Sequence, residues 1–405
     1  MMTYQINLTI DDIRSAAAAI KSEVLRTPLV TSPMLSKTTG AELFVKHENL
    51  QVTNSFKVRG SLNKLLSLSE KEKSDGVIAM SAGNHAQAVA YHASKLGLPA
   101  TIVMPEGTPF VKIKNTEAWG ANIVLSGKDL QDCRQLVDEM IDQRQLTLVH
   151  PYDDFKIIAG QGTIALEIYE DCPDLEQLIV PIGGGGLISG IAVAAKALNP
   201  ALDIIGVECD RYPSMSRALG RDVVAEPGPT IAEGIAVKEV GKLTQQIVDE
   251  LVSEIIVVKE EALERAVSSL LTVQKTMVEG AGAAGLAAIL TYPEKFKNRK
   301  VGLILSGGNI DPRILSSILI RELERENKII TLRLQTDDQP GTLGLIATEL
   351  GKCGANILEV SHRRMFLDVP AKSATIDIMI EIMDTQHASI VIDALNKFGF
   401  QVLEL

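Results

Sequence analysis

Uninterrupted apolar runs recur along most of the chain and are separated by stretches with helical periodicity. Such runs stand at residues 77–80, 101–104, 178–181, 204–207 and 301–305. Apolar character without alternation is typical of strands in a parallel sheet that is covered on both faces. Helical patterns occupy residues 84–96 and 187–198. The alternation of strands and helices predicts βαβ units and a doubly wound α/β architecture.

Three of these predicted strands run directly into glycine-rich turns. The turns begin at Ser81-Ala82-Gly83, at Gly183 and at Ser306-Gly307. In open α/β sheets, ligands bind outside the carboxyl ends of the strands. We therefore expect the three turns to converge on one site.

The pattern restarts after the charged run at residues 321–328. We predict a strand at 329–335, a helix at 342–353, strands at 355–364 and 373–383, a helix at 385–398 and a strand at 400–404. This βαββαβ order predicts an α+β ferredoxin-like module at 329–405, which follows a larger domain at 1–326. The module contains no cluster of titratable groups suited to catalysis, so we expect it to regulate or to oligomerise.

Composition and charge limit the kinds of molecule that this protein can be expected to bind. The 405 residues are 46% hydrophobic and 22% charged, with a net charge of −11. This acidic balance argues against nucleic-acid binding, which needs a basic surface. No apolar run approaches the roughly 18 residues of a membrane span, and the N-terminus lacks the features of a secretory signal. The four cysteines show no metal-binding spacing. We expect a cytoplasmic protein that contacts neither nucleic acid nor membrane.

Four consecutive glycines, Gly183 to Gly186, follow a predicted strand and precede a predicted helix. Glycine is entropically costly, and such a run suits a loop whose backbone N–H groups approach an anion at a helix N-terminus. A dinucleotide fits poorly, because the third glycine of G-x-G-x-x-G is replaced by Ser189. No Gly-Lys-Ser/Thr follows either, which excludes a P-loop. A small phosphorylated cofactor fits better.

The same chain carries a lysine in a distinctive setting, Asn54-Ser55-Phe56-Lys57-Val58-Arg59-Gly60, together with Ser81-Ala82-Gly83-Asn84-His85 and Ser306-Gly307-Gly308-Asn309. A lysine can form a Schiff base with a carbonyl cofactor. With these motifs in this order, the chain resembles the fold-type II pyridoxal-phosphate enzymes. It is most similar to the threonine/serine dehydratases (threonine ammonia-lyases) that end in an ACT domain. The resemblance implies a two-lobed catalytic domain, with the small lobe at about 50–155, and a C-terminal ACT domain.

The resemblance also implies roles for individual residues. Lys57 would hold pyridoxal 5'-phosphate covalently, with Phe56 beside it. Asn84 would donate a hydrogen bond to the phenolic oxygen of the cofactor, and Ser306 would face its pyridine nitrogen. The phosphate would lie against Gly183, Gly184, Gly185, Gly186 and Leu187, and the substrate carboxylate against Ser81, Ala82, Gly83 and His85. The residue before Ser55 is often glycine in such motifs, whereas here it is Asn54.

These residues favour elimination. A hydroxyl at Ser306, in place of a carboxylate, would not keep the pyridine nitrogen protonated, so loss of a β-hydroxyl as the α-proton departs becomes the easier path. Lys57, with its pKa lowered by burial, would take that proton. We expect conversion of L-threonine to 2-oxobutanoate and ammonia, and of L-serine to pyruvate. The sequence leaves open a role in isoleucine biosynthesis or in threonine breakdown.

Two other functions were weighed. Serine racemases carry a serine where this chain has Ala82, and a methyl cannot exchange protons, which argues against racemase or another fold-type II activity. A non-enzymatic amino-acid sensor is the alternative from a different class, and the intact Lys57 argues against it. We expect His85 to shape its loop rather than to act as a general base.

Metal and effector sites are further expectations from the resemblance. Some relatives bind a divalent ion, and Glu208 with the Tyr212 carbonyl matches two of its ligands, but Ser214 replaces the second acid. Residues 337–343 and 354–357 resemble the ACT ligand loop and the strand beside it, and Pro340 and Gly341 form a turn that opens a helix N-terminus. An allosteric amino-acid effector such as isoleucine or valine would contact Pro340, Gly341, Asn356 and Ile357. The alternative is that residues 329–405 form a dimerisation module that binds no ligand. A homodimer or homotetramer is expected.

Overall fold

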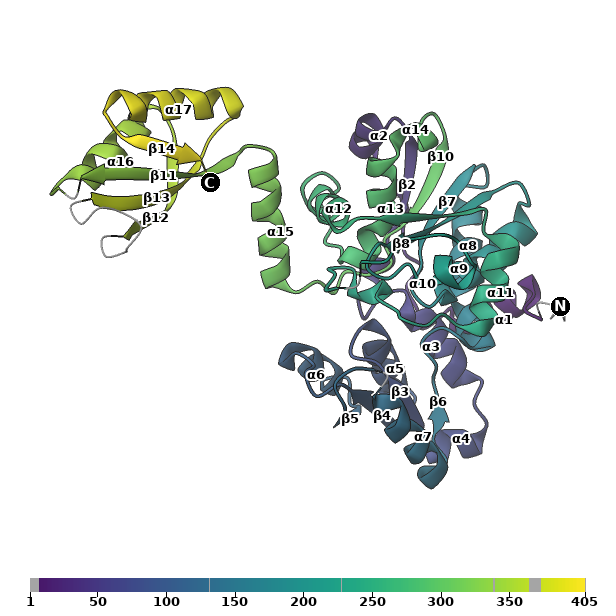
Figure 1. The fold of residues 1–405 in the computed structure, drawn as a ribbon. Coiled ribbons are helices and arrows are strands. Elements are labelled where there is room, and N and C mark those ends of the chain that lie inside the picture. The colour runs from purple at the N-terminus through teal and green to yellow at the C-terminus, as the bar shows by residue number, and fades with distance from the viewer. Residues whose placement is uncertain (1–6, 131, 227, 338, 364–372, 405) are drawn as a thin grey trace. The chain divides into compact units, whose positions relative to one another are not determined.

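The computed structural model describes residues 7–130, 132–226, 228–337, 339–363 and 373–404. The chain divides into two compact units between Asp311 and Pro312 (Figure 1). No helix in the described ranges is long and apolar enough to cross a membrane.

The first unit contains a six-stranded sheet in the order β1-β2-β10-β7-β8-β9. Every neighbouring pair is parallel except β1–β2. The predicted strands at 178–181, 204–207 and 301–305 are confirmed as β7, β8 and β10. The strands are β1 (Leu29–Thr31), β2 (Glu42–Lys46), β7 (Gln177–Pro181), β8 (Asp203–Cys209), β9 (Glu254–Val258) and β10 (Lys300–Ile304).

Helices cover both faces of this sheet, which explains its continuous apolar strands. Successive side chains of a strand point to opposite faces. On β7, Leu178 and Val180 join the core cluster formed with α8 (Phe155–Asp171), α9 (Gly186–Leu198) and α11 (Lys242–Leu251). Ile179 instead meets Gly285 of α13 (Gly280–Thr291), on which α12 (Glu260–Thr272) packs.

A second, parallel sheet in the order β5-β4-β3-β6 forms a smaller lobe of the same unit. Its β3 (Val77–Met80) and β4 (Ala100–Met104) confirm the predicted strands at 77–80 and 101–104, beside β5 (Asn122–Leu125) and β6 (Thr147–Leu148). Its two faces pack against α5 (Asn84–Lys95) and α7 (Cys133–Arg144). Helix α3 (Lys57–Leu66) contacts both α5 and α8, so it joins the two lobes (Figure 1).

Further helices belong to the first unit. They are α1 (Ile10–Ile20), α2 (Pro33–Thr39), η1 (Glu48–Leu50), α4 (Glu70–Asp75), α6 (Phe110–Glu117), α10 (Ser214–Ala218), η2 (Glu233–Ile235) and α14 (Pro293–Phe296).

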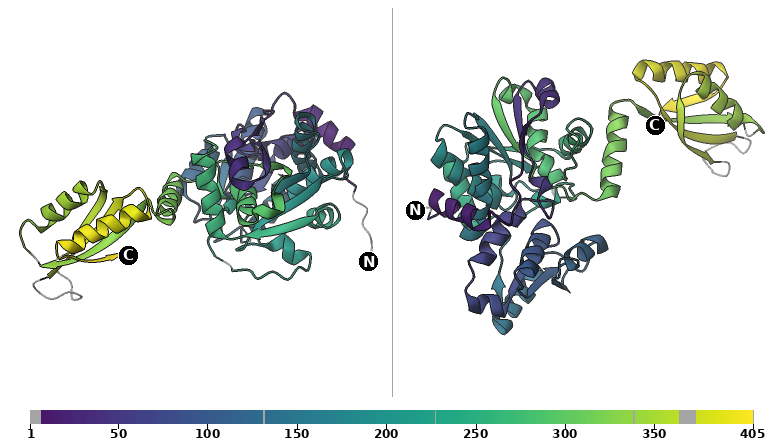
Figure 2. Two further views of the ribbon diagram at one scale, coloured as in Figure 1. Left: turned by 90° about the horizontal axis from the view of Figure 1, so that it is seen from above. Right: turned by 180° about the vertical axis from the view of Figure 1, so that it is seen from behind.

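The second unit has the predicted βαββαβ order, preceded by α15 (Pro312–Arg325), which the sequence assigned to the larger domain. Its antiparallel sheet runs β12-β13-β11-β14, the order of a ferredoxin-like fold. The two helices of the βαββαβ order pack against this sheet (Figure 2), and their apolar side chains form one core cluster with those of the strands. The elements are β11 (Ile329–Asp337), α16 (Thr342–Lys352), β12 (Asn356–Arg363), β13 (Ser373–Glu381), α17 (Thr385–Lys397) and β14 (Gln401–Glu404).

Candidate functional site

Lys57 is the first residue of α3. Its Nζ donates a hydrogen bond to the Pro151 carbonyl at 2.7 Å and lies 5.2 Å from the centroid of the Phe56 ring. Burial lowers the pKa of Lys57 to about 8, although the negative charge of Glu279 opposes that shift. A larger fraction of this amine is therefore neutral near pH 7 than of a solvated lysine, which suits a nucleophilic or basic role.

The loop before Lys57 is bound to the loop that follows β10. Phe56 N donates to the Ser306 carbonyl at 3.1 Å, and Gly308 N donates to the Asn54 carbonyl at 2.9 Å. Asn54 has a φ of 56°, in the left-handed region that glycine and asparagine adopt most readily. This conformation explains why a glycine or an asparagine, rather than a branched residue, stands at this position.

Ser306 itself is only 4% exposed. Its hydroxyl has no hydrogen-bond partner among the described side chains, while its carbonyl is used by Phe56. The structure thus brings Lys57, Phe56 and Ser306 together and leaves a neutral oxygen available beside them.

The glycine loop joins β7 to α9 and has the features of an anion cradle. In the described part of the chain, the amides of Gly183, Gly184 and Gly185 donate to no protein acceptor. Gly185 caps α9 with a φ of 94°, and Leu187 lies in the first turn of that helix. Free N–H groups at the positive end of a helix suit a phosphate. The residues present therefore fit the phosphate of pyridoxal phosphate.

Close packing on Tyr152 also requires the glycines. A Cβ on Gly184 would lie 2.3 Å from the Tyr152 ring, and a Cβ on Gly186 would lie 2.9 Å from the Tyr152 backbone. Tyr152 is held by its hydroxyl, which donates to the Glu239 carbonyl at 2.8 Å. Because Pro151 contacts Lys57 and Tyr152 contacts the glycine loop, this short segment links the two predicted cofactor contacts.

Asn84 is the first residue of α5, and both the nitrogen and the oxygen of its side-chain amide form hydrogen bonds. Its Nδ2 donates to Glu279 Oε1 at 2.7 Å, and its Oδ1 accepts from Asn309 Nδ2 at 2.7 Å. Burial raises the pKa of Glu279 to about 7, although the Asn84 hydrogen bond opposes the shift. Asn84 is thereby connected to the same loop after β10 that contains Ser306.

The predicted substrate loop follows β3. Gly83 N donates to Ser81 Oγ at 3.2 Å, and no atom beyond the adjoining residues lies within 4 Å of the position that a Cβ on Gly83 would take. Ala82 is half-buried and packs against the core of the small lobe. The site beside Gly83 is therefore open enough for a small ligand.

His85 is buried, with its Nε2 2.7 Å from the Val149 carbonyl. Burial, with a contribution from the positive charge of Lys57, lowers its pKa to about 3. His85 is consequently neutral and ties the loop to the end of β6, which agrees with the expected architectural role.

Glu208 lies at the end of β8 and is fully buried. Its two carboxylate oxygens accept from Met215 N at 2.7 Å and Ser216 N at 3.0 Å, in the first turn of α10. Among the described residues, no group of three or more His, Cys, Asp or Glu side chains could hold a metal ion. The structure thus gives Glu208 a helix-capping role and adds no support for the metal prediction.

The predicted effector residues lie in the second unit. Gly341 caps α16 with a φ of 90°, directly after the exposed Pro340. Asn356 is exposed and donates to Glu381 Oε2 at 3.2 Å, whereas Ile357 packs against the apolar core. Asp338, in the predicted ligand loop, lies outside the described residues.

A buried ionic cluster that was not predicted from the sequence lies in α3 beside Lys57 and in the elements around it. Arg59 forms hydrogen bonds to both oxygens of Glu48 and both oxygens of Glu167, at 2.6–2.9 Å. Lys46 Nζ also contacts Glu167, at 2.5 Å. The two cations and two anions fix α3 against β2 and α8, so the cluster holds the helix that presents Lys57.

Sequence reasoning also missed Tyr152 and Glu279 and assigned no contact to Asn309. Asn309 was visible as the last residue of the quoted Ser-Gly-Gly-Asn motif, and Glu279 directly precedes the small-residue run of α13. Tyr152 has no local signal, because it is recognisable only from its contact with distant glycines.

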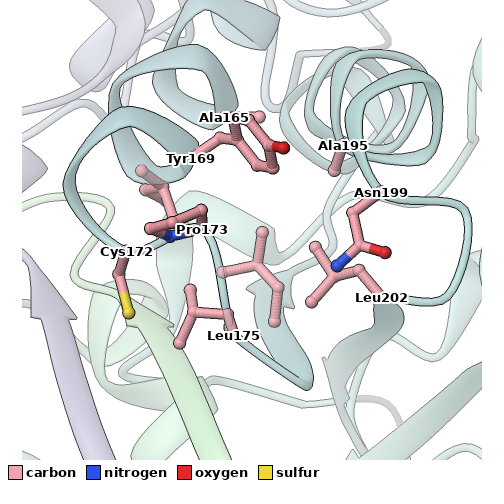
Figure 3. A pocket seen from close by; sticks show the side chains of 10 residues that line it. Ala165, Tyr169, Cys172, Pro173, Leu175, Ala195, Asn199 and Leu202 are labelled. Atoms are coloured by element: carbon pink, nitrogen blue, oxygen red, sulfur yellow. The ribbon is translucent and has the colours of Figure 1, made fainter.

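A small cavity of about 20 Å³ lies elsewhere in the first unit, between α8, α9 and the start of β7 (Figure 3). Its lining includes Tyr169, Leu178 and Asn199. The glycine loop follows the opposite end of β7, so this cavity is separate from the site around Lys57.

Comparison with known proteins places the chain in a family. Residues 20–307 match the family described as "Pyridoxal-phosphate dependent enzyme". The chain is 42% identical over 397 residues to an L-threonine ammonia-lyase of Thermotoga maritima, covering 98% of this chain and 99% of the relative. A solved serine racemase from maize has a TM-score of 0.73 and 37% identity, covering 79% of this chain and 99% of that one. The processed threonine deaminase isoform 2 from Solanum lycopersicum has a TM-score of 0.71 and 34% identity, covering 76% and 92%.

Among the described residues, the amides at the start of α9 and the hydroxyl of Ser306 after β10 have no protein partner, and burial lowers the pKa of Lys57; these three features agree with this match. The chain belongs to the pyridoxal-phosphate dependent enzymes.

Proposed function

We propose that this protein is a threonine ammonia-lyase, which converts L-threonine to 2-oxobutanoate and ammonia and L-serine to pyruvate and ammonia. The observation that carries the proposal is the position of Lys57, at the start of α3 and hydrogen-bonded beside the glycine loop, with its pKa lowered. The similarity to an L-threonine ammonia-lyase over 98% of the chain supports the choice of substrate.

In this proposal, different residues of the first unit bind different parts of the cofactor and of the substrate. The amides from Gly183 to Leu187 would bind the phosphate of pyridoxal phosphate. Lys57 would form the covalent bond to this cofactor, and Phe56 would lie beside that bond. Ser306 would face the pyridine nitrogen. Asn84 donates to the phenolic oxygen. The substrate carboxylate lies at the loop Ser81–His85, where Gly83 leaves open space.

Pyridoxal phosphate, when bound, supplies the electron sink that makes the α-hydrogen of an amino acid acidic. Lys57 Nζ would accept the Cα proton of the substrate, because its lowered pKa leaves it partly neutral. The Cα–H and Cβ–O bonds would break and a Cα–Cβ double bond would form, while the hydroxyl takes up one proton, so that the net loss from the substrate is the Cα hydrogen and the hydroxyl as one water molecule. The released enamine then hydrolyses in solution to the 2-oxo acid and ammonia.

Racemisation is the alternative that the similar maize serine racemase raises. It needs a proton donor on the substrate face opposite Lys57. Ala82 stands where the racemases carry serine, and its half-buried methyl group cannot donate a proton. We therefore favour elimination over racemisation.

We further propose that residues 1–326 form the catalytic domain and 329–405 an ACT domain that regulates the enzyme allosterically. The ferredoxin-like strand order supports this reading. The exposed turn at Pro340 and Gly341 opens α16, whose N-terminal amides suit the carboxylate of an amino acid such as isoleucine or valine. Asn356 and Ile357, at the start of β12, would line the same site. A homodimer or homotetramer is part of this proposal.

The test is a 2-oxo-acid assay with L-threonine, L-serine and their D-enantiomers. We expect product from the L-enantiomers and none from a Lys57→Ala variant, which should also lose the visible absorption of covalently bound cofactor. Lys71→Ala, which changes an exposed lysine, is the matched control and should keep both. Absence of 2-oxobutanoate in the presence of bound cofactor would refute the proposed activity.

A further inference from the structure

A chain of side-chain amides leads from the loop beside Lys57 to Asn84. Asn309 Nδ2 donates to the Thr53 carbonyl at 2.9 Å and to Asn84 Oδ1 at 2.7 Å. A backbone carbonyl can only accept, so the Thr53 contact defines which end of the Asn309 amide carries the hydrogens. Both of those hydrogens are then used, one on Thr53 and one on Asn84.

The other end of the Asn309 amide supports the same orientation. Asn54 Nδ2 donates to Asn309 Oδ1 at 3.2 Å. Asn54 is the residue that departs from the glycine usual at this position, so its side chain adds a contact that glycine lacks. The loop that precedes Lys57 thus contacts Asn309 twice, through Thr53 and through Asn54.

Asn309 in turn determines the orientation of the Asn84 side-chain amide. Because Asn84 Oδ1 accepts from Asn309, its Nδ2 is the end that meets Glu279 Oε1, at 2.7 Å. An NH₂ group has two hydrogens. In the described part of the chain, the second hydrogen of Asn84 Nδ2 has no protein acceptor.

Gly307 leaves the space for this contact. A Cβ on Gly307 would lie 2.4 Å from Glu279 Oε1 and 3.0 Å from Asn84 Nδ2. The Gly307 carbonyl also accepts from Glu279 N at 3.0 Å. The backbone therefore brings Glu279 to Asn84 only because residue 307 has no side chain.

We propose that Asn309 and Glu279 are positioning residues that hold the Asn84 amide in one orientation, with a free Nδ2 hydrogen directed to the phenolic oxygen of bound pyridoxal phosphate. The reversed amide would present Oδ1 to that oxygen, and two acceptors repel each other. The inference deepens the proposed function and rests on its assignment of Asn84.

The test compares the affinity of the cofactor-free, full-length protein for two ligands: pyridoxal phosphate and 3-deoxypyridoxal phosphate, which lacks the phenolic oxygen. An Asn309→Asp variant replaces the donor toward Asn84 by an acceptor and should reverse the Asn84 amide. We expect its affinity for pyridoxal phosphate to fall by about 10-fold or more, as loss of a hydrogen bond to a charged oxygen implies. Its affinity for the deoxy analogue should stay unchanged.

Asn309→Ala removes the donor without adding an acceptor. It should show the same selectivity with a smaller loss of affinity for pyridoxal phosphate, and it replaces the aspartate variant in this test if that variant does not fold. Asn122→Ala changes an exposed asparagine at the start of β5, outside this chain of amides, and is the matched control, with the ratio of the two affinities expected to stay at the wild-type value. Equal losses for both ligands, or no loss in either Asn309 variant, would overturn the proposal. Failure of the wild-type protein to bind pyridoxal phosphate would instead refute the proposed function.

Discussion

Replacing Glu279 by glutamine is expected to remove a pH-dependent loss of stability from the cofactor-free protein. Burial raises the pKa of this carboxyl from 4.5 to about 7. Glutamine retains an oxygen that can accept the hydrogen bond from Asn84 Nδ2. The substitution therefore removes the titration while it keeps the contact.

The sign follows from the protons bound in each state. Between pH 4.5 and about 7, Glu279 is ionised in the unfolded chain but protonated in the native state. The native state then binds more protons, so the free energy of unfolding falls as the pH rises through this window. At about 1.4 kcal/mol for each pH unit, the window corresponds to about 3 kcal/mol. That contribution is fully present below pH 4.5 and lost above about pH 7.

Buried histidines give the opposite dependence in part of the same window. Their pKa values are lowered by burial, so their contribution to stability is lost as the pH falls; they are His47, His85, His92 and His150. These residues are present in both proteins. The difference between wild type and Glu279→Gln therefore isolates the carboxyl.

The assay is urea unfolding of both cofactor-free proteins from pH 4.5 to 7.5, followed by circular dichroism. We expect the glutamine variant to gain about 3 kcal/mol relative to wild type across this range. Glu176→Gln is the control, since hydrogen bonds from Lys300 N and Arg299 lower the pKa of that carboxyl, so it titrates below this range and its wild-type-to-variant difference should stay nearly constant with pH. A wild-type-to-variant difference that does not change with pH would refute the reasoning for Glu279.

Two further substitutions test the scaffold of the site. Gly184→Ala places a Cβ 2.3 Å from the Tyr152 ring and should cost about 1–3 kcal/mol by overpacking. Thermal melting should show the loss and its partial recovery on adding Tyr152→Ala; equal loss in the double variant would contradict this. Arg59→Ala leaves Glu48 and Glu167 without their buried partner and should cost about 3–5 kcal/mol in urea unfolding. An unchanged unfolding midpoint would show that the cluster does not hold α3.

The second unit and the most apolar strands of the first could be predicted from hydrophobic pattern, whereas β1, β2, β5, β6 and β9 were not predicted. Each of the five apolar runs is a strand, and the βαββαβ order of residues 329–405 agrees closely with the structure. These predictions succeeded because strand and helix periodicity are local properties that burial reinforces. The compact units instead divide before α15, since that helix packs with β11 rather than continuing the first unit.

The candidate site was predictable where a local motif carried its chemistry. Lys57, the glycine loop and Ser306 lie in short motifs that carry the family resemblance, and the structure brings the loops of Lys57 and Ser306 into direct backbone contact. The role of Asn54 was visible only as a departure from the usual glycine. Its positive φ and its contact with Asn309 supply the physical reason for an asparagine.

The sequence by itself determined the most apolar strands, the order of elements in residues 329–404 and the residue types at the glycine-rich turns, because these depend on spacing over a few positions. Only the tertiary structure decided which side chains support those turns. Glu279 is 195 positions from Asn84, and the Lys57 amine meets a carbonyl 94 positions away. No local pattern encodes such pairs. They exist because parallel strands bring the ends of distant segments to one edge of a sheet, where burial then lowers the pKa of Lys57 and raises that of Glu279.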